Sequence, residues 1–208
     1  MDDVAVKAAV VGRGGWRGGW GGWVWPGVVC AVVLVATVVA VRWEGRVWYC
    51  ACAEFALWKG DVWSSHCSQH PFDPYSFTHF SHGLIFASVL GLIAKRWHAG
   101  WQLAASLGLA GAWEVAENSE WVINRYRTVT MSLDYLGDSV TNAGFDVVCC
   151  GIGFFVAKRL GLWRTAALFV VIEAALLILV RDNLTLNVLM LISPVEGVKV
   201  WQMGGRGG

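Results

Sequence analysis

The sequence has almost no net charge, +1 at pH 7, and no cluster of Lys and Arg. A nucleic-acid-binding surface needs such a basic cluster, so this class of protein is set aside. The sequence also lacks the Gly-x-Ser-x-Gly motif that presents the serine nucleophile in one large class of hydrolases. It has no inverted repeat and no pair of helices broken by Pro or Gly, which argues against many transporter folds.

Apolar residues make up 56% of the 208 residues, and the mean hydropathy is +0.53, which argues against a water-soluble single domain. Two stretches have the length of a bilayer span, about 20 apolar residues, and three weaker ones lie between them. The sequence therefore predicts an all-α, polytopic transmembrane bundle of about five helices. Their predicted ranges are 24–41, 79–96, 101–122, 138–158 and 162–180.

The predicted transmembrane domain covers residues 24–200. Residues 1–23, rich in Gly and Trp, are predicted to be a flexible leader, and 201–208 a flexible tail. The first apolar run is longer than the roughly 7 to 15 residues of a signal peptide, which favours a retained helix. The short loops with basic residues and no acids favour a cytoplasmic N-terminus. That orientation places the long aromatic loop 42–78 on the outer side, as a lid or an interfacial segment.

The three weaker helices carry polar side chains near one end. Each pair lies 12 to 16 residues from the inner end of its helix, and the pairs are His79 and His82, Glu114 and Glu117, and Asn142 and Asp146. At about 1.5 Å of rise per residue, antiparallel neighbours would bring all three pairs to the same depth. Asp134, Asp138, Asn142 and Asp146 also follow one another at intervals of four. Because a charge facing lipid costs at least about 2.5 kcal/mol, these side chains should line a shared polar pocket near the outer leaflet.

Imidazoles and carboxylates on neighbouring helices are ligands for zinc, iron or manganese. The predicted metal ligands are His79, His82, Glu114, Glu117, Asp138, Asn142 and Asp146. In a catalytic reading, Glu117 or Glu114 acts as general base. Two competing interpretations stay open. One is a proton or ion pathway, and the other is a structural network in which protonated carboxyls and neutral histidines join the helices through hydrogen bonds.

The loop contains Cys50, Cys52 and Cys67 together with His66 and His70. These residues could hold zinc, but their spacing matches no standard zinc finger. On an oxidising face, a disulfide with a spare thiol, or free thiols, is the favoured interpretation. The sequence leaves these alternatives open.

Several runs between residues 42 and 160 carry a family resemblance. They are WEGRVWYC, FALWKGDVWSSHCSQH, DPYSFTHFSHGLIF, WEVAENSEWVINRYRT and DYLGDSVTNAGFDVVCC. They resemble an uncharacterised family of bacterial multi-pass inner-membrane proteins, known only as a domain of unknown function. A looser similarity to VanZ-like proteins rests on His79-Phe80, on Glu114 or Glu117, and on Asp138 with Asn142, although the expected glycine comes later, at Gly144. The resemblance implies a bacterial inner-membrane location and a functional polar core, but no reaction.

Two classes of function follow from these observations. The first is a metal-dependent hydrolase or transferase acting on a lipid or lipid-linked envelope substrate, which would reach the pocket by lateral diffusion. The alternative is a non-enzymatic membrane assembly factor or small-solute permease with a structural polar core. Membrane lipids are the expected partners in both, nucleic acid is not, and the sequence does not set the oligomeric state.

Overall fold

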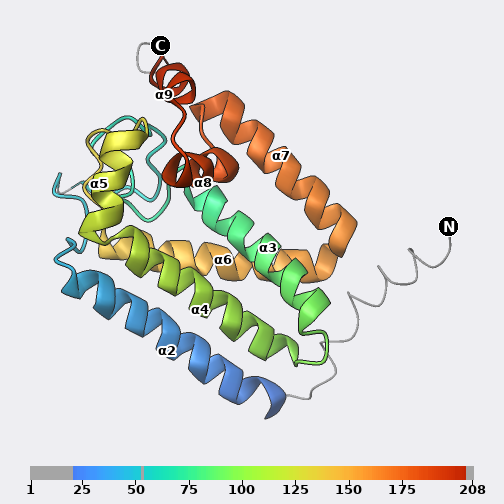
Figure 1. The fold of residues 1–208 in the computed structure, drawn as a ribbon. Helices are drawn as coiled ribbons and strands as arrows, with labels where there is room; N and C mark the ends of the chain where they lie inside the picture. Colours follow the sequence, from blue (N-terminus) through green and yellow to red (C-terminus); the bar gives the residue numbers. More distant parts are fainter. Residues whose placement is uncertain (1–20, 53, 205–208) are drawn as a thin grey trace.

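The computed structural model describes residues 21–52 and 54–204 (Figure 1). This part contains eight helices: α2 (Gly21–Trp43), α3 (Ser76–Ile93), α4 (Ala99–Glu117), α5 (Glu120–Val129), α6 (Val140–Leu160), α7 (Leu162–Val180), α8 (Leu184–Ile192) and α9 (Glu196–Met203). Apart from one isolated bridge between Trp58 and Phe72, it contains no β-structure. The predicted all-α bundle is therefore confirmed. The predicted leader lies outside the described residues as far as residue 20, and its last residues already belong to α2.

Four of the described helices, α2, α3, α6 and α7, are long and apolar enough to cross a membrane. The chain is thus a helical membrane protein. Helix α4 also has 19 residues but falls short in apolarity, because it includes polar side chains such as Gln102, Ser106, Glu114 and Glu117. The structure therefore supports four membrane-spanning helices by length and composition, whereas the sequence predicted about five.

Two predicted helix boundaries are wrong near the polar residues. The helix predicted over 101–122 ends at Glu117, because the Ser119 side chain caps a new helix by accepting a hydrogen bond from the Val122 amide. Likewise α6 begins at Val140, with Ser139 as its cap, and not at residue 138. Asp134 and Asp138 consequently precede the helix. The predicted polar stripe along one helix face is therefore not continuous.

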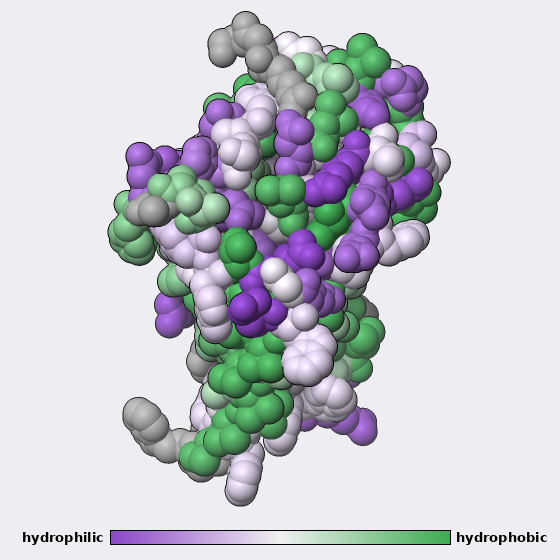
Figure 2. Space-filling model, turned by 90° about the vertical axis from the view of Figure 1, so that its left-hand side faces the viewer, coloured by the Kyte–Doolittle hydropathy of each residue, from purple (hydrophilic) through white to green (hydrophobic). Residues whose placement is uncertain are grey.

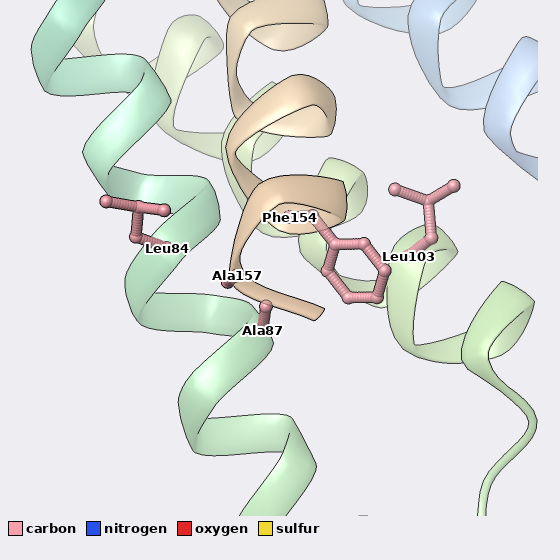
Figure 3. Packing of buried hydrophobic residues seen from close by; sticks show 5 residues of the cluster. All are labelled: Leu84, Ala87, Leu103, Phe154 and Ala157. Atoms are coloured by element: carbon pink, nitrogen blue, oxygen red, sulfur yellow. The ribbon is translucent and has the colours of Figure 1, made fainter. Parts of the chain in front are cut away.

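The centre of the bundle is the contact between α3 and α6, and α2 packs mainly on α4. Figure 3 shows the main apolar cluster, in which Leu84 and Ala87 of α3 meet Phe154 and Ala157 of α6 and Leu103 of α4. All five side chains are buried, Phe154 completely. This cluster holds the helices together away from the polar end of the bundle.

Glycine allows α3 and α6 to approach closely. A Cβ atom at Gly83 would collide with the backbone carbonyl of Cys150, and one at Gly153 with the carbonyl of Phe80. We expect Gly83→Ala to lower the free energy of unfolding by about 1 to 3 kcal/mol, because the helix backbones must separate. Thermal unfolding in detergent measures this. In the matched control, Gly108→Ala, a Cβ meets nothing within 4 Å, so equal destabilisation of both variants would contradict the prediction.

One face of the protein has a hydrophobic lower part. Figure 2 shows hydrophobic residues gathered there, and polar and hydrophobic residues mixed above it. Helix α2 supplies a row of exposed valines, namely Val24, Val28, Val32, Val35 and Val39. An apolar surface of this kind suits contact with lipid tails.

The long loop and the C-terminal segment lie at one end of the bundle. Between α2 and α3 the described chain forms turns and no helix, and residues 76–78 of the predicted loop already belong to α3. The predicted flexible tail is wrong as far as Met203, which ends α9. Glu173, buried in α7, accepts hydrogen bonds from the Leu184 and Thr185 amides at the start of α8. That glutamate therefore has a structural role.

Candidate functional site

An open pocket lies between the loop and the ends of α3, α4, α5 and α6; about 870 Å³ of empty space, open solvent included, lies within it. The loop residues 62–65 and 67–69 form one side of it, and Tyr126, Tyr135 and Leu136 form another. Five of the seven predicted ligands line it, namely His79, His82, Glu117, Asp138 and Asp146. The prediction that three helices bring polar side chains to a common depth thus corresponds to a real cavity.

His79, Glu114 and Asp146 meet beside this pocket. One donor atom from each residue lies within 4.8 Å of the others. His79 Nδ1 is 2.9 Å from Glu114 Oε1, and His79 Nε2 is 3.8 Å from Asp146 Oδ2. The residues are only 6%, 0% and 2% exposed, respectively. Three helices, α3, α4 and α6, therefore deliver an imidazole and two carboxylates to one point.

Several polar atoms in this group have no hydrogen-bond partner. They are His79 Nδ1, both carboxylate oxygens of Glu114, and Asp146 Oδ1. The short contact between His79 and Glu114 has the distance of an ion pair but not the alignment of a hydrogen bond. Buried polar groups normally find partners because leaving them unpaired is costly. These atoms are therefore available to bind a further group.

Glu114 also belongs to a second group, with Glu117 and Asp138. Glu117 Oε1 accepts a hydrogen bond of 2.9 Å from the Tyr126 hydroxyl, while its Oε2 has no partner. Asp138 is held on both oxygens, by the Tyr135 hydroxyl and by the Asn118 side chain. Asp138 precedes α6 and is buried, and this burial raises the pKa of its carboxyl above the ordinary value.

Two predicted ligands do not join either group. His82 stacks on Phe86 and lies edge-on to His79, so it lines the pocket without converging on the carboxylates. Asn142 donates its side-chain hydrogen bond to the His70 carbonyl, 2.8 Å away, and so ties α6 to the loop. Neither residue belongs to a group of possible metal ligands among the described residues, and their role as ligands stays a prediction. The spacing along α3 and α6 placed His82 and Asn142 on the helix faces that carry the polar residues, but it did not predict the direction in which each side chain points.

The sequence did not reveal three polar partners of the site. Tyr126 connects Glu117 to Asn187 of α8, and Tyr135 holds Asp138. All three come from segments outside the predicted helices that carry the site. Only a pattern of conserved polar residues across relatives could have indicated them, because nothing in their local spacing does.

The comparisons now identify the family. The family model described as "Protein of unknown function (DUF2585)" matches residues 41–204. The chain belongs to the DUF2585 family. This confirms the resemblance to an uncharacterised bacterial membrane-protein family, and the matched residues include both groups of candidate ligands.

Curated relatives extend over most of the DUF2585 chain. A UPF0314 protein of Paracoccus denitrificans is 44% identical over 171 residues, which are 82% of this chain and 89% of the relative. A UPF0314 protein of Sphingopyxis alaskensis is 46% identical over 180 residues, covering 86% and 96% of the two chains. No solved structure matches. The looser similarity to VanZ-like proteins is not shown by these comparisons and stays a prediction.

Proposed function

We propose that this DUF2585 protein is a metal-dependent hydrolase or transferase of the bacterial inner membrane that acts on a lipid or lipid-linked envelope substrate. The observation that carries the proposal is the buried group of His79, Glu114 and Asp146, whose nitrogen and oxygen atoms face one another beside an open pocket without forming an aligned hydrogen bond. A purely structural network would be expected to pair these atoms with each other or with neighbouring donors.

The donor set fits a divalent cation. One imidazole nitrogen and two carboxylate oxygens suit zinc, iron or manganese, and a cation would satisfy atoms that otherwise have no partner. Three protein ligands leave a position free for water or substrate, which is the arrangement of catalytic rather than structural sites. Bound there, the metal would polarise a substrate oxygen and make water easier to deprotonate.

The geometry separates the roles of the two candidate bases. Glu114 is fully buried, belongs to both ligand groups and does not line the pocket, so it serves as a ligand. Glu117 lines the pocket, is held by Tyr126 through one oxygen and has the other oxygen unpaired. Glu117 would take the proton from the attacking water or hydroxyl and return it to the leaving group. Tyr126 acts as a positioning residue.

The lining of the pocket supports a substrate with both polar and apolar parts. Trp63, Trp113, Met131 and Leu136 share the wall with the carboxylates. The pocket lies where the transmembrane helices end and the loop begins, the level at which lipid headgroups are found. With the N-terminus in the cytoplasm, this level is the outer leaflet of the inner membrane.

Elemental analysis of the detergent-purified protein tests the metal centre. We expect a His79→Ala, Asp146→Asn double variant to lose about one equivalent of zinc, iron or manganese relative to wild type, because two of the three proposed ligands, including the imidazole, are removed. The matched control is His82→Phe, which keeps the ring stacking and removes a histidine that does not belong to the group of His79, Glu114 and Asp146. Equal metal content in the double variant and wild type, with both proteins folded, would contradict the proposed metal site.

A further inference from the structure

A second group of metal-ligand side chains lies in the loop, apart from the pocket groups. Cys50, Cys52, His66 and His70 each offer a donor atom, and all four atoms lie within 4.8 Å of one another. Cys50 Sγ is 3.2 Å from His66 Nδ1, and Cys52 Sγ is 3.8 Å from His70 Nε2. With metal bonds of 2.0 to 2.3 Å, ligand atoms of a tetrahedral zinc site lie about 3.3 to 3.8 Å apart. The four side chains are therefore close to the spacing that a zinc ion would require.

The surroundings of His70 orient it for this role. Its Nδ1 lies 2.8 Å from the Tyr49 hydroxyl and 3.2 Å from the Ala56 carbonyl, which leaves Nε2 directed at Cys52. A metal-binding histidine usually has its other nitrogen fixed in this way. The His70 side chain is completely buried, and burial lowers its pKa, which favours the neutral form that binds metals.

Cys50 Sγ also has a contact that suits metal binding. The Cys52 amide approaches it at 3.4 Å, which helps to stabilise negative charge on the sulfur. A divalent metal binds the thiolate form of cysteine, so its binding would release protons.

We propose that Cys50, Cys52, His66 and His70 bind a structural Zn²⁺ ion. Two cysteines and two histidines are a closed tetrahedral ligand set, which leaves no position for substrate and thus indicates a structural site. This site is independent of the proposed function. The zinc ion would cross-link the loop. The sequence alone did not favour zinc, because the spacing of these residues matches no standard zinc finger.

The structure also counts against the disulfide interpretation. All six cysteines are free thiols. Cys67, the third loop cysteine, is not in the group and instead packs with Val62, Met131 and Tyr75. Burial raises the pKa of Cys67 well above its ordinary value, so it is an inert thiol.

The position of the group indicates what the zinc ion does. The Val47 and Trp48 carbonyls accept hydrogen bonds from the start of α6, and so do the carbonyls of Ser68 and His70. Cys50 and Cys52 follow the first anchored segment, and His66 and His70 lie beside or within the second. Residues 62–65 and 67–69 line the pocket. A zinc ion would tie the segments to each other and so fix the wall of the pocket.

Metal analysis of the full-length protein in detergent tests the proposal. After purification with added zinc, we expect one zinc equivalent to be lost in Cys50→Ser, Cys52→Ser and retained in Cys67→Ser, whose cysteine lies in the same loop outside the group. The His79→Ala, Asp146→Asn variant should keep this equivalent, which separates the loop site from the pocket site. Zinc content unchanged in the Cys50→Ser, Cys52→Ser variant would overturn the proposal.

A spectroscopic measurement on wild type removes the dependence on variants that fail to fold. Cobalt(II) exchanged into the protein should give a sulfur-to-cobalt charge-transfer band and the strong visible absorption of a tetrahedral site. Zinc should abolish both by displacement. Absence of these bands in protein with reduced thiols, or a Cys50 to Cys52 disulfide found by mass spectrometry in protein purified with zinc, would contradict a zinc site.

Discussion

Glu117→Gln is expected to abolish the cellular activity of the protein while leaving its fold and metal content intact. The substitution keeps the shape of the side chain and lets its oxygen still accept the Tyr126 hydrogen bond, but an amide cannot take a proton. Loss of a general base typically costs about 10² to 10⁴ in rate. The measurement compares lipids of a deletion strain, by mass spectrometry, before and after complementation with each variant.

The design separates a catalytic from a structural role. Wild type should reverse the lipid change of the deletion strain, and Glu117→Gln should not, although it is present in the membrane at the wild-type level. Glu120→Gln is the matched control, because Glu120 is an exposed glutamate three residues further along the chain. Full complementation by Glu117→Gln would rule out its role as base, and loss of the protein from the membrane would favour the structural network.

Much of the fold could be predicted from the sequence because a bilayer restricts what a chain can do. Stretches of about 20 apolar residues leave few alternatives to a helix, and five long helices occur near the predicted ranges. The errors lie at the helix ends. Ser119 and Ser139 stop or start helices through side-chain hydrogen bonds, and no hydropathy pattern reports such caps.

The same distinction applies to the candidate site. The depth argument brought His79, Glu114 and Asp146 together correctly, because depth follows from the rise per residue and the direction of each helix. It could not separate His79 from His82, which lie on the same helix face at nearly the same depth. Their different partners depend on tertiary packing, with Phe86 and Trp113 occupying the space around His82.

The loop group shows a further limit of sequence analysis. Local spacing of Cys50, Cys52, His66 and His70 gave no recognised motif, so the favoured interpretation was thiols or a disulfide. The four side chains meet because hydrogen bonds to the start of α6 hold both ends of the loop side by side. Such long-range pairing is not encoded in any short pattern.

Asp182→Asn is expected to remove a large part of the pH dependence of stability. Asp182 follows α7, is 4% exposed, and accepts hydrogen bonds from Tyr75, Asn183 and Gln202. Burial raises its pKa from 3.8 to about 6, although these hydrogen bonds oppose the shift. Between these two values the folded protein binds more protons than the unfolded chain, so the free energy of unfolding falls as the pH rises.

The size of the effect follows from the pKa difference. At about 1.4 kcal/mol per pKa unit, the raised pKa of Asp182 lowers the free energy of unfolding by about 3 kcal/mol between a pH below 4 and pH 7. Asparagine resembles the protonated acid, since its oxygen can accept from the Asn183 amide while its amino group donates to the Tyr75 oxygen. Thermal unfolding in detergent should therefore find Asp182→Asn more stable than wild type at pH 7 to 8, with a difference that shrinks as the pH falls towards 4. A difference that stays constant over this range would mean that Asp182 titrates at the same pH in the folded and unfolded chain, and the buried carboxylate would then not be a source of instability.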